Sequence, residues 1–191
     1  LPSGLQDEVL VTFLYKYNGW AFLGRILQNI VRSSFNNDDN EKTELVVDLI
    51  ELLTQVVQDN KGSDAIAVLD VLDSLSAYMD DSNVIEILFR LFEQNLHSRN
   101  VTILVSLTNL FTSLVPLIDV KIWSYLSKSA LLSSNGSKEG FASIIFGAIE
   151  MINGDYQLTI ALIKLANALV QDCLGLEEKV NKNTRLKFPP M

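Results

Sequence analysis

Cysteine, histidine and proline are scarce in this 191-residue chain, which has one cysteine (Cys173), one histidine (His97) and four prolines. A single cysteine cannot form an internal disulfide, so the chain is not a small secreted domain held by disulfides. A structural zinc site takes four nitrogen or sulfur ligands, and this composition excludes one. With 48% hydrophobic residues and nine glycines, the chain is too apolar to be intrinsically disordered and is not collagen-like.

Basic residues are also few: 15 Lys and Arg stand against 23 Asp and Glu, for a net charge of −8. This balance argues against direct binding of nucleic acid or of an anionic membrane surface. Of the acidic residues, 13 lie between residues 38 and 86, where only Lys42 and Lys61 are basic. The acidic segment 38–86 is therefore either a surface for a basic partner or a solvated face that keeps the chain soluble.

No targeting signal opens the sequence, because residues 1–8 lack a basic region and carry Asp7 and Glu8. The chain starts without Met, so we consider both one large domain and a piece of a longer protein. Residues 100–118 contain no charged residue and approach the length of a membrane span. A polar stripe runs through Thr102, Ser106, Asn109 and Ser113, and the opposite stripe, which includes Ile103, Leu107 and Phe111, is apolar. This division nevertheless favours a helix packed between two protein layers, and we predict no transmembrane segment.

Apolar residues recur with the helical period of 3.6 through nearly the whole chain, and no segment alternates as a strand does. Turn and cap residues separate these segments: Asn18-Gly19, Ser63, Asn83, Asn100 and Asp119 precede helices, while Gly175 is expected to end the last one. The predicted helices span residues 6–17, 20–34, 41–58, 63–78, 83–96, 100–115, 119–132, 138–153 and 156–174.

The later helices start about 17 to 20 residues apart, so helix pairs recur about every 36 to 38 residues, close to the HEAT and armadillo periods. Linkers of about 3 to 6 residues place consecutive helices antiparallel and adjacent. The predicted fold is all-α: a HEAT/armadillo-like α-solenoid of stacked antiparallel helix pairs over residues 1–174, with about nine helices. Residues 175–191 form a polar, mildly basic tail or linker. A globular helical bundle is the alternative.

Reactive groups do not converge in the sequence. His97 and Cys173 are 76 positions apart, and we expect the histidine at a helix C-terminus and the cysteine packed as a small apolar residue. The segment 136–140 lacks the spacing of a phosphate-binding loop, and 38–41 lacks that of a calcium loop. The acidic pairs Asp48/Glu51 and Asp70/Asp73 are three residues apart and share one helix face. We predict no catalytic residue, no cofactor and no metal, hence no enzyme.

Other residues point to tight packing. Gly24 and Gly147 are expected to let another helix approach closely, and Trp20 and Trp123 are expected in the core. The third helix should bury Leu45, Leu49, Leu52, Leu53 and Val56. The last predicted helix is apolar on nearly all sides, including Ile160 and Ile163, so something should cover its far side, most simply a following helix pair of a longer chain.

Two stretches carry a resemblance. Tyr17-Asn18-Gly19-Trp20, which opens the helix continuing to Leu27, and the helix at 155–165 together resemble the very large scaffold nucleoporins of the nuclear pore inner ring. The resemblance implies a superhelical scaffold segment at the nuclear pore complex of the nuclear envelope, which holds other nucleoporins through short helical linker segments. That family has no catalytic residues. Its members are several times longer, so the resemblance also implies a fragment.

A second function fits the same predicted fold: a karyopherin-like HEAT-repeat nuclear transport receptor or adaptor. The two interpretations differ in whether the protein stays in an assembly or releases its partner on binding a small GTPase. A solenoid alone does not distinguish them, since fold does not give function.

Overall fold

The structure is a computed structural model of the chain. It describes residues 8–33, 40–60, 65–80, 82–117, 120–129, 131–132, 150 and 154–185, with the backbone alone at 65–66 and 176–185. The predicted helix at 138–153 with Gly147, and the predicted cap residues Ser63 and Asp119, lie outside the described residues.

Every regular element within these ranges is helical, as the sequence predicts. Residues 8–11 are helical and continue into a π-helical turn. The elements are η1 (Thr12–Lys16), α2 (Gly19–Arg32), α3 (Asn40–Asp59), α4 (Ala65–Ser76), α5 (Val84–Ser98), α6 (Val101–Leu114), α7 (Ile122–Leu126) and α9 (Gln157–Arg185).

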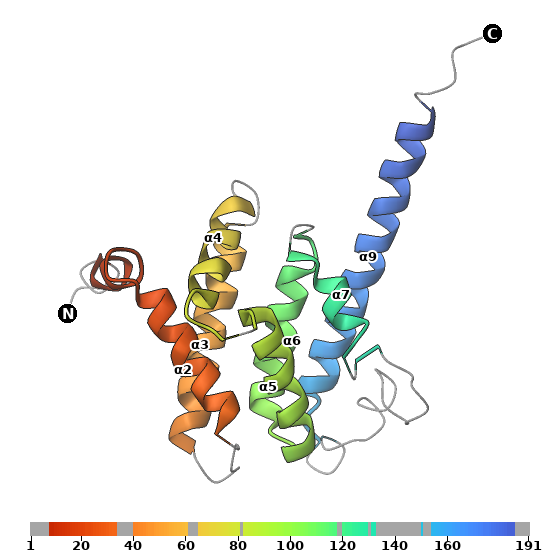
Figure 1. Cartoon of the computed structure of the whole chain (residues 1–191). Helices are drawn as coiled ribbons and strands as arrows, with labels where there is room; N and C mark the ends of the chain where they lie inside the picture. The colour runs from red at the N-terminus through yellow and green to blue at the C-terminus, as the bar shows by residue number, and fades with distance from the viewer. Residues whose placement is uncertain are drawn as a thin grey trace.

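The helices lie in two layers (Figure 1). One layer holds α3, α6 and α9, and α6 packs against both of the others along its length. The second layer holds α2, α4, α5 and α7, in which α2 contacts α4 and α5, and α5 contacts α7. Figure 1 shows α3, α6 and α9 running in the same direction, opposite to α2 and α5. The most extensive contacts are therefore made between helices that are not consecutive in the sequence.

Helix α6 lies at the centre of the core. Its predicted apolar face is buried, including Ile103, Leu107 and Phe111. The predicted polar stripe is only half exposed, because Ser113 and Ser106 are buried as well. Since α6 has α3 on one side and α9 on the other, it is a helix between protein neighbours, as its sequence indicates.

Asparagine caps fix the starts of two helices. The side-chain oxygen of Asn83 accepts a hydrogen bond from the Glu86 amide at 3.0 Å at the start of α5. The Asn100 side chain accepts one from the Ile103 amide at 3.3 Å at the start of α6. Both predicted caps are thus confirmed, and each satisfies an amide that has no partner within its own helix.

Two of the predicted helix ends are wrong. Helix α7 has five residues rather than the span to Leu132. Gly175 does not end the last helix, since α9 continues to Arg185. A glycine inside a helix costs about 1 kcal/mol relative to Ala but does not forbid the helix, and among described glycines only Gly154 has the positive φ, +68°, typical of helix ends and turns.

The buried face of α3 is rotated from the predicted one. Leu49 and Leu53 are buried as expected, but Leu45 is 45% exposed. Apolar residues occur on both sides of this helix, so its pattern allows two overlapping faces, and the packing of α6 decides between them. The buried residues are Val46, Leu49, Ile50, Leu53 and Val57.

Candidate interaction surfaces

The two reactive side chains lie apart in the fold. His97 is exposed in the last turn of α5, at the helix C-terminus as predicted. Cys173 is exposed on α9, so the expectation that it packs in the core is wrong. Among the described residues, no group of three or more His, Cys, Asp or Glu side chains is placed to hold a metal ion.

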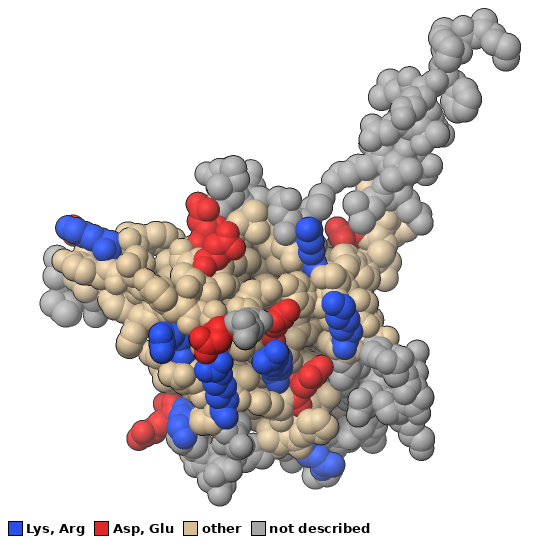
Figure 2. Space-filling model, viewed as in Figure 1, with Lys and Arg blue, Asp and Glu red and all other residues tan. Residues whose placement is uncertain are grey.

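The acidic pairs predicted on the third and fourth helices lie in solvent. Asp48 and Glu51 are exposed on α3, and Asp70 and Asp73 are exposed on α4. The face in Figure 2 carries blue and red side chains intermixed, separated by uncharged surface. A basic partner for the acidic segment 38–86 remains a prediction.

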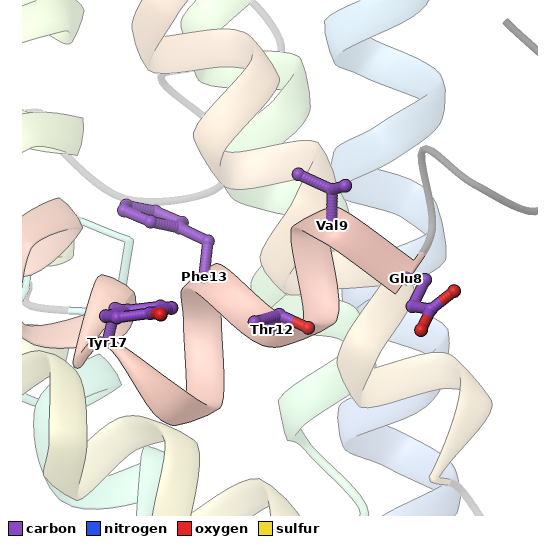
Figure 3. Close-up of a pocket in the computed structure, with 5 residues that line it drawn as sticks. All are labelled: Glu8, Val9, Thr12, Phe13 and Tyr17. Atoms are coloured by element: carbon purple, nitrogen blue, oxygen red, sulfur yellow. The ribbon is translucent and has the colours of Figure 1, made fainter.

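The first apolar surface lies at the N-terminal end of the described chain. Glu8, Val9, Thr12, Phe13 and Tyr17 line a cavity of about 540 Å³. Figure 3 shows Val9 and Phe13 on the same side of this helical segment. Val9 is 64% exposed and Tyr17 is 68% exposed. Apolar side chains four residues apart that remain in solvent form a surface suited to another helix.

The Tyr17-Asn18-Gly19-Trp20 motif positions this surface. Asn18 takes the left-handed conformation, with φ of 54° and ψ of 35°, between η1 and α2. A Cβ on Gly19 would lie 2.6 Å from the Phe13 ring, so only glycine lets η1 fold this closely against α2. Trp20 is buried and meets the Tyr15 ring edge to face at 6.2 Å. The motif that carries the family resemblance is thus a turn that exposes Phe13 and Tyr17.

A polar cavity of about 240 Å³ lies between α2 and α5. Arg32 and Asp80 form an exposed ion pair at 2.8 Å on its wall. The Gln94 side chain donates to the Val31 carbonyl at 2.9 Å and ties the two helices together. Because the Arg32–Asp80 pair is exposed, it contributes little to stability.

The second apolar surface belongs to α9. One side of this helix is buried against α6 through Leu158, Leu162 and Leu165, whereas Ile160 and Ile163 are more than half exposed. Helix α9 is anchored at both ends of this contact. The Glu150 carboxylate accepts from the amides of Leu158 and Thr159. The Trp123 indole nitrogen donates to Asp172 at 2.8 Å. Trp123 is half-buried and packs against the core, so its predicted core position is confirmed only in part.

The stretch Gln157–Gly175 of α9 is the one described helix that is long and apolar enough to cross a membrane by length and composition. Core helices of soluble proteins share this length and composition. The other apolar helix, Val101–Leu114, is shorter.

The sequence does not by itself predict the apolar surface at residues 8–17. Its signal is the spacing of Val9, Phe13 and Tyr17 at four-residue steps. That spacing is also typical of a core-facing helix stripe, which is why the pattern alone does not reveal an exposed surface.

Comparisons with known proteins agree with the resemblance. Residues 10–188 match the family described as nucleoporin Nup188, N-terminal subdomain III. The chain is 33% identical over 186 residues to nucleoporin NUP188 of Saccharomyces cerevisiae, which covers 93% of this chain and 11% of that relative. No solved structure matches. The chain therefore belongs to the Nup188 family of nucleoporins, as a counterpart of its N-terminal subdomain III.

Proposed function

We propose that the chain is a non-catalytic scaffold segment of a nuclear pore complex subunit, which holds other nucleoporins through helix-in-groove contacts. Its family places it at the nuclear pore complex of the nuclear envelope. The karyopherin-like alternative has no comparable support, because the family match is to a nucleoporin over nearly the whole chain.

The layering supports a HEAT/armadillo-like superhelix. In such arrays equivalent helices of successive repeats stack side by side, and each repeat contacts mainly its neighbours. Helices α3, α6 and α9 stack in this way in one layer, and α2 and α5 do so in the other. On this interpretation α4 and α7 are the connecting helices of three-helix, armadillo-like units, and a longer protein continues the stack.

The observation that carries the partner-holding role is the exposed apolar cavity at residues 8–17. An amphipathic helix binds such a surface with apolar anchors at i, i+3 or i+4, and i+7. Phe13 stands edge to face with Phe22 at 6.3 Å, and this contact favours the orientation of the ring in the cavity wall. The partner that fits is a short helical linker segment of another nucleoporin.

The test uses the full-length protein and purified helical segments of other nucleoporins. Val9→Ser with Tyr17→Ser removes two exposed cavity walls and should leave the fold intact. Lys16→Ser, on η1 but outside the cavity lining, is the matched control. We expect the double variant to lose at least about tenfold in affinity for the segment that binds, which is about 1.4 kcal/mol. Unchanged affinity for every segment that binds the wild type would refute this site.

A further inference from the structure

The polar cavity between α2 and α5 contains two side-chain atoms with unmet hydrogen-bonding capacity. Gln28 of α2 and Gln94 of α5 both line this cavity of about 240 Å³. The Nε2 atom of Gln28 and the Oε1 atom of Gln94 are buried, and neither has a hydrogen-bond partner among the described residues. The whole Gln28 residue is only 3% exposed. The cavity therefore offers one buried donor and one buried acceptor.

The surroundings of Gln94 fix which of its amide atoms lacks a partner. Its Nε2 atom donates to the Val31 carbonyl at 2.9 Å, and the carbonyl oxygen of a glutamine side chain accepts but does not donate. Oε1 is therefore the atom left over. A buried polar atom without a partner destabilises the fold, so native proteins rarely keep one unless water or a ligand satisfies it.

The cavity lining also has an excess of positive charge. Arg32, Arg90 and Asp80 all line it, and Asp80 pairs with Arg32 at 2.8 Å. Arg90 is exposed and forms no ion pair with any described residue, although Glu86 and Glu93 line a neighbouring cavity that Arg90 also borders. Two arginines and one aspartate leave the lining with a net charge of +1, which is complementary to one carboxylate rather than to a doubly charged phosphate.

The size of the cavity indicates part of a larger partner. Pockets that hold a whole small molecule usually measure about 300 to 1,000 Å³, and this one is smaller. An acidic residue of a peptide offers a main-chain carbonyl that accepts, an N–H that donates and a carboxylate. These groups match the Gln28 donor, the Gln94 acceptor and the Arg90 cation. A carboxylate alone would leave Gln94 without a donor.

We propose that this cavity binds an acidic residue of a peptide segment that belongs to another protein. The carboxylate of that residue accepts from the Arg90 guanidinium, in a charge-assisted hydrogen bond of the strong kind. Its main-chain carbonyl accepts from Gln28, and a peptide N–H donates to Gln94. The residues of this site are separate from those of the cavity at residues 8–17, so the proposal does not rest on the proposed function.

Saturation-transfer NMR with the full-length protein tests the recognition. The probe is N-acetyl-glutamate N-methylamide, which carries a carboxylate between two peptide units. The glutamine analogue lacks the charge, and acetate lacks the peptide units. We expect the glutamate probe to bind at least about tenfold more tightly than either control, since a hydrogen bond to a charged group contributes at least this much. Equal affinity of the glutamine analogue would refute the carboxylate, and equal affinity of acetate would show a site for free anions only.

Two arginine variants locate the binding. Arg90→Gln should weaken binding of the glutamate probe at least about tenfold. Arg25→Gln is the matched control, because Arg25 is an exposed arginine of α2 outside the cavity lining, and it should leave the affinity unchanged. Equal losses would mean unspecific attraction by charge and would refute the site. Val9→Ser with Tyr17→Ser should leave probe binding unchanged, which separates this proposal from the proposed function.

Gln28→Leu distinguishes a peptide site from a cavity that holds buried water only. Leucine has a similar size but no amide, so replacing an amide that lacks a partner should leave the local stability of α2 unchanged or higher. Binding of the glutamate probe should nevertheless fall. Hydrogen–deuterium exchange of α2 in the full-length protein measures the local stability. Faster exchange in the Gln28→Leu protein would show that water already satisfies the amide and would overturn the proposal, as would a wild-type protein that does not bind the probe.

Discussion

The α carbon of Gly24 faces the main chain of Leu75, and a Cβ on Gly24 would lie 1.9 Å from the Leu75 carbonyl oxygen. This contact joins α2 to the end of α4, the closest approach that any described glycine makes to main-chain atoms. The close helix approach predicted from the sequence at Gly24 is confirmed.

We expect Gly24→Ala to destabilise the protein, although Ala favours a helix by about 1 kcal/mol. The carbonyl cannot move without displacing α4, and overpacking of this kind costs about 1 to 3 kcal/mol or more. Chemical denaturation followed by circular dichroism measures the change. Gly175→Ala is the matched control. Gly175 also lies within a helix, but a Cβ there would meet no other atom within 4 Å, so this substitution should raise the stability of the protein by about 0.5 to 1 kcal/mol. Equal effects of the two substitutions would contradict the geometry.

The Asn83 side chain links two elements. Its oxygen caps α5 while its nitrogen donates to the Tyr125 hydroxyl on α7 at 2.8 Å. Loss of a cap costs about 1 kcal/mol of stability, and Asn83→Ala should cost more than this because it also removes the hydrogen bond to Tyr125. Asn83→Ser should restore the cap alone, because serine keeps an oxygen for the Glu86 amide but has no amide nitrogen to donate to Tyr125. Tyr125→Phe removes only the second bond. A double-mutant cycle in which the Asn83 and Tyr125 changes are simply additive would show that this bond contributes nothing.

Local sequence signals predict where the helices of this fold begin better than they predict how the helices pack. Asn83 and Asn100 are short polar residues directly before apolar runs, so the starts of α5 and α6 could be read from the sequence. The buried face of α3 could not, because Val46 and Leu45 are equally apolar and only the position of α6 selects between them. Gly175 shows the reverse case: a local stop signal is outweighed by continuation of α9.

The same reasoning applies to the surfaces. Ile160 and Ile163 already indicate a second apolar side of α9, and the structure adds that this side is exposed and regularly spaced. The cavity at Phe13 depends on a left-handed Asn18 and on a π-helical turn. The turn at Asn18-Gly19 is predicted from the sequence, because both residues tolerate the left-handed conformation, whereas nothing in the sequence predicts the π-helical turn.

Glu150 caps the start of α9 although it precedes the helix by several residues. Its carboxylate accepts from the amides of Leu158 and Thr159 and from the Thr159 hydroxyl. Glu150 is buried, so Glu150→Ala would leave its hydrogen-bond donors without a partner. We expect this change to lower the stability of the protein by about 1 to 3 kcal/mol. Glu150→Gln keeps one acceptor and should cost less. Thermal unfolding distinguishes the two, and an alanine variant as stable as wild type would show that these bonds do not hold the start of α9.

The exposed apolar side of α9 (the seam), which consists of Tyr156, Ile160, Ile163, Val170 and Leu174, predicts the behaviour of the 191-residue chain by itself. Exposed apolar patches of several hundred Å² drive association, so we expect the isolated chain to self-associate at micromolar concentration. Because Ile160 and Ile163 are exposed rather than packed on α6, changing both to Glu should yield a folded, soluble monomer instead of unfolding the C-terminal region. Sedimentation velocity gives the oligomeric state, and circular dichroism confirms the helix content.

Lys164→Glu, with the same change in net charge, should still associate, which separates the loss of apolar surface from charge repulsion. A wild-type chain that sediments as a monomer at high concentration would mean that the seam is covered within these 191 residues.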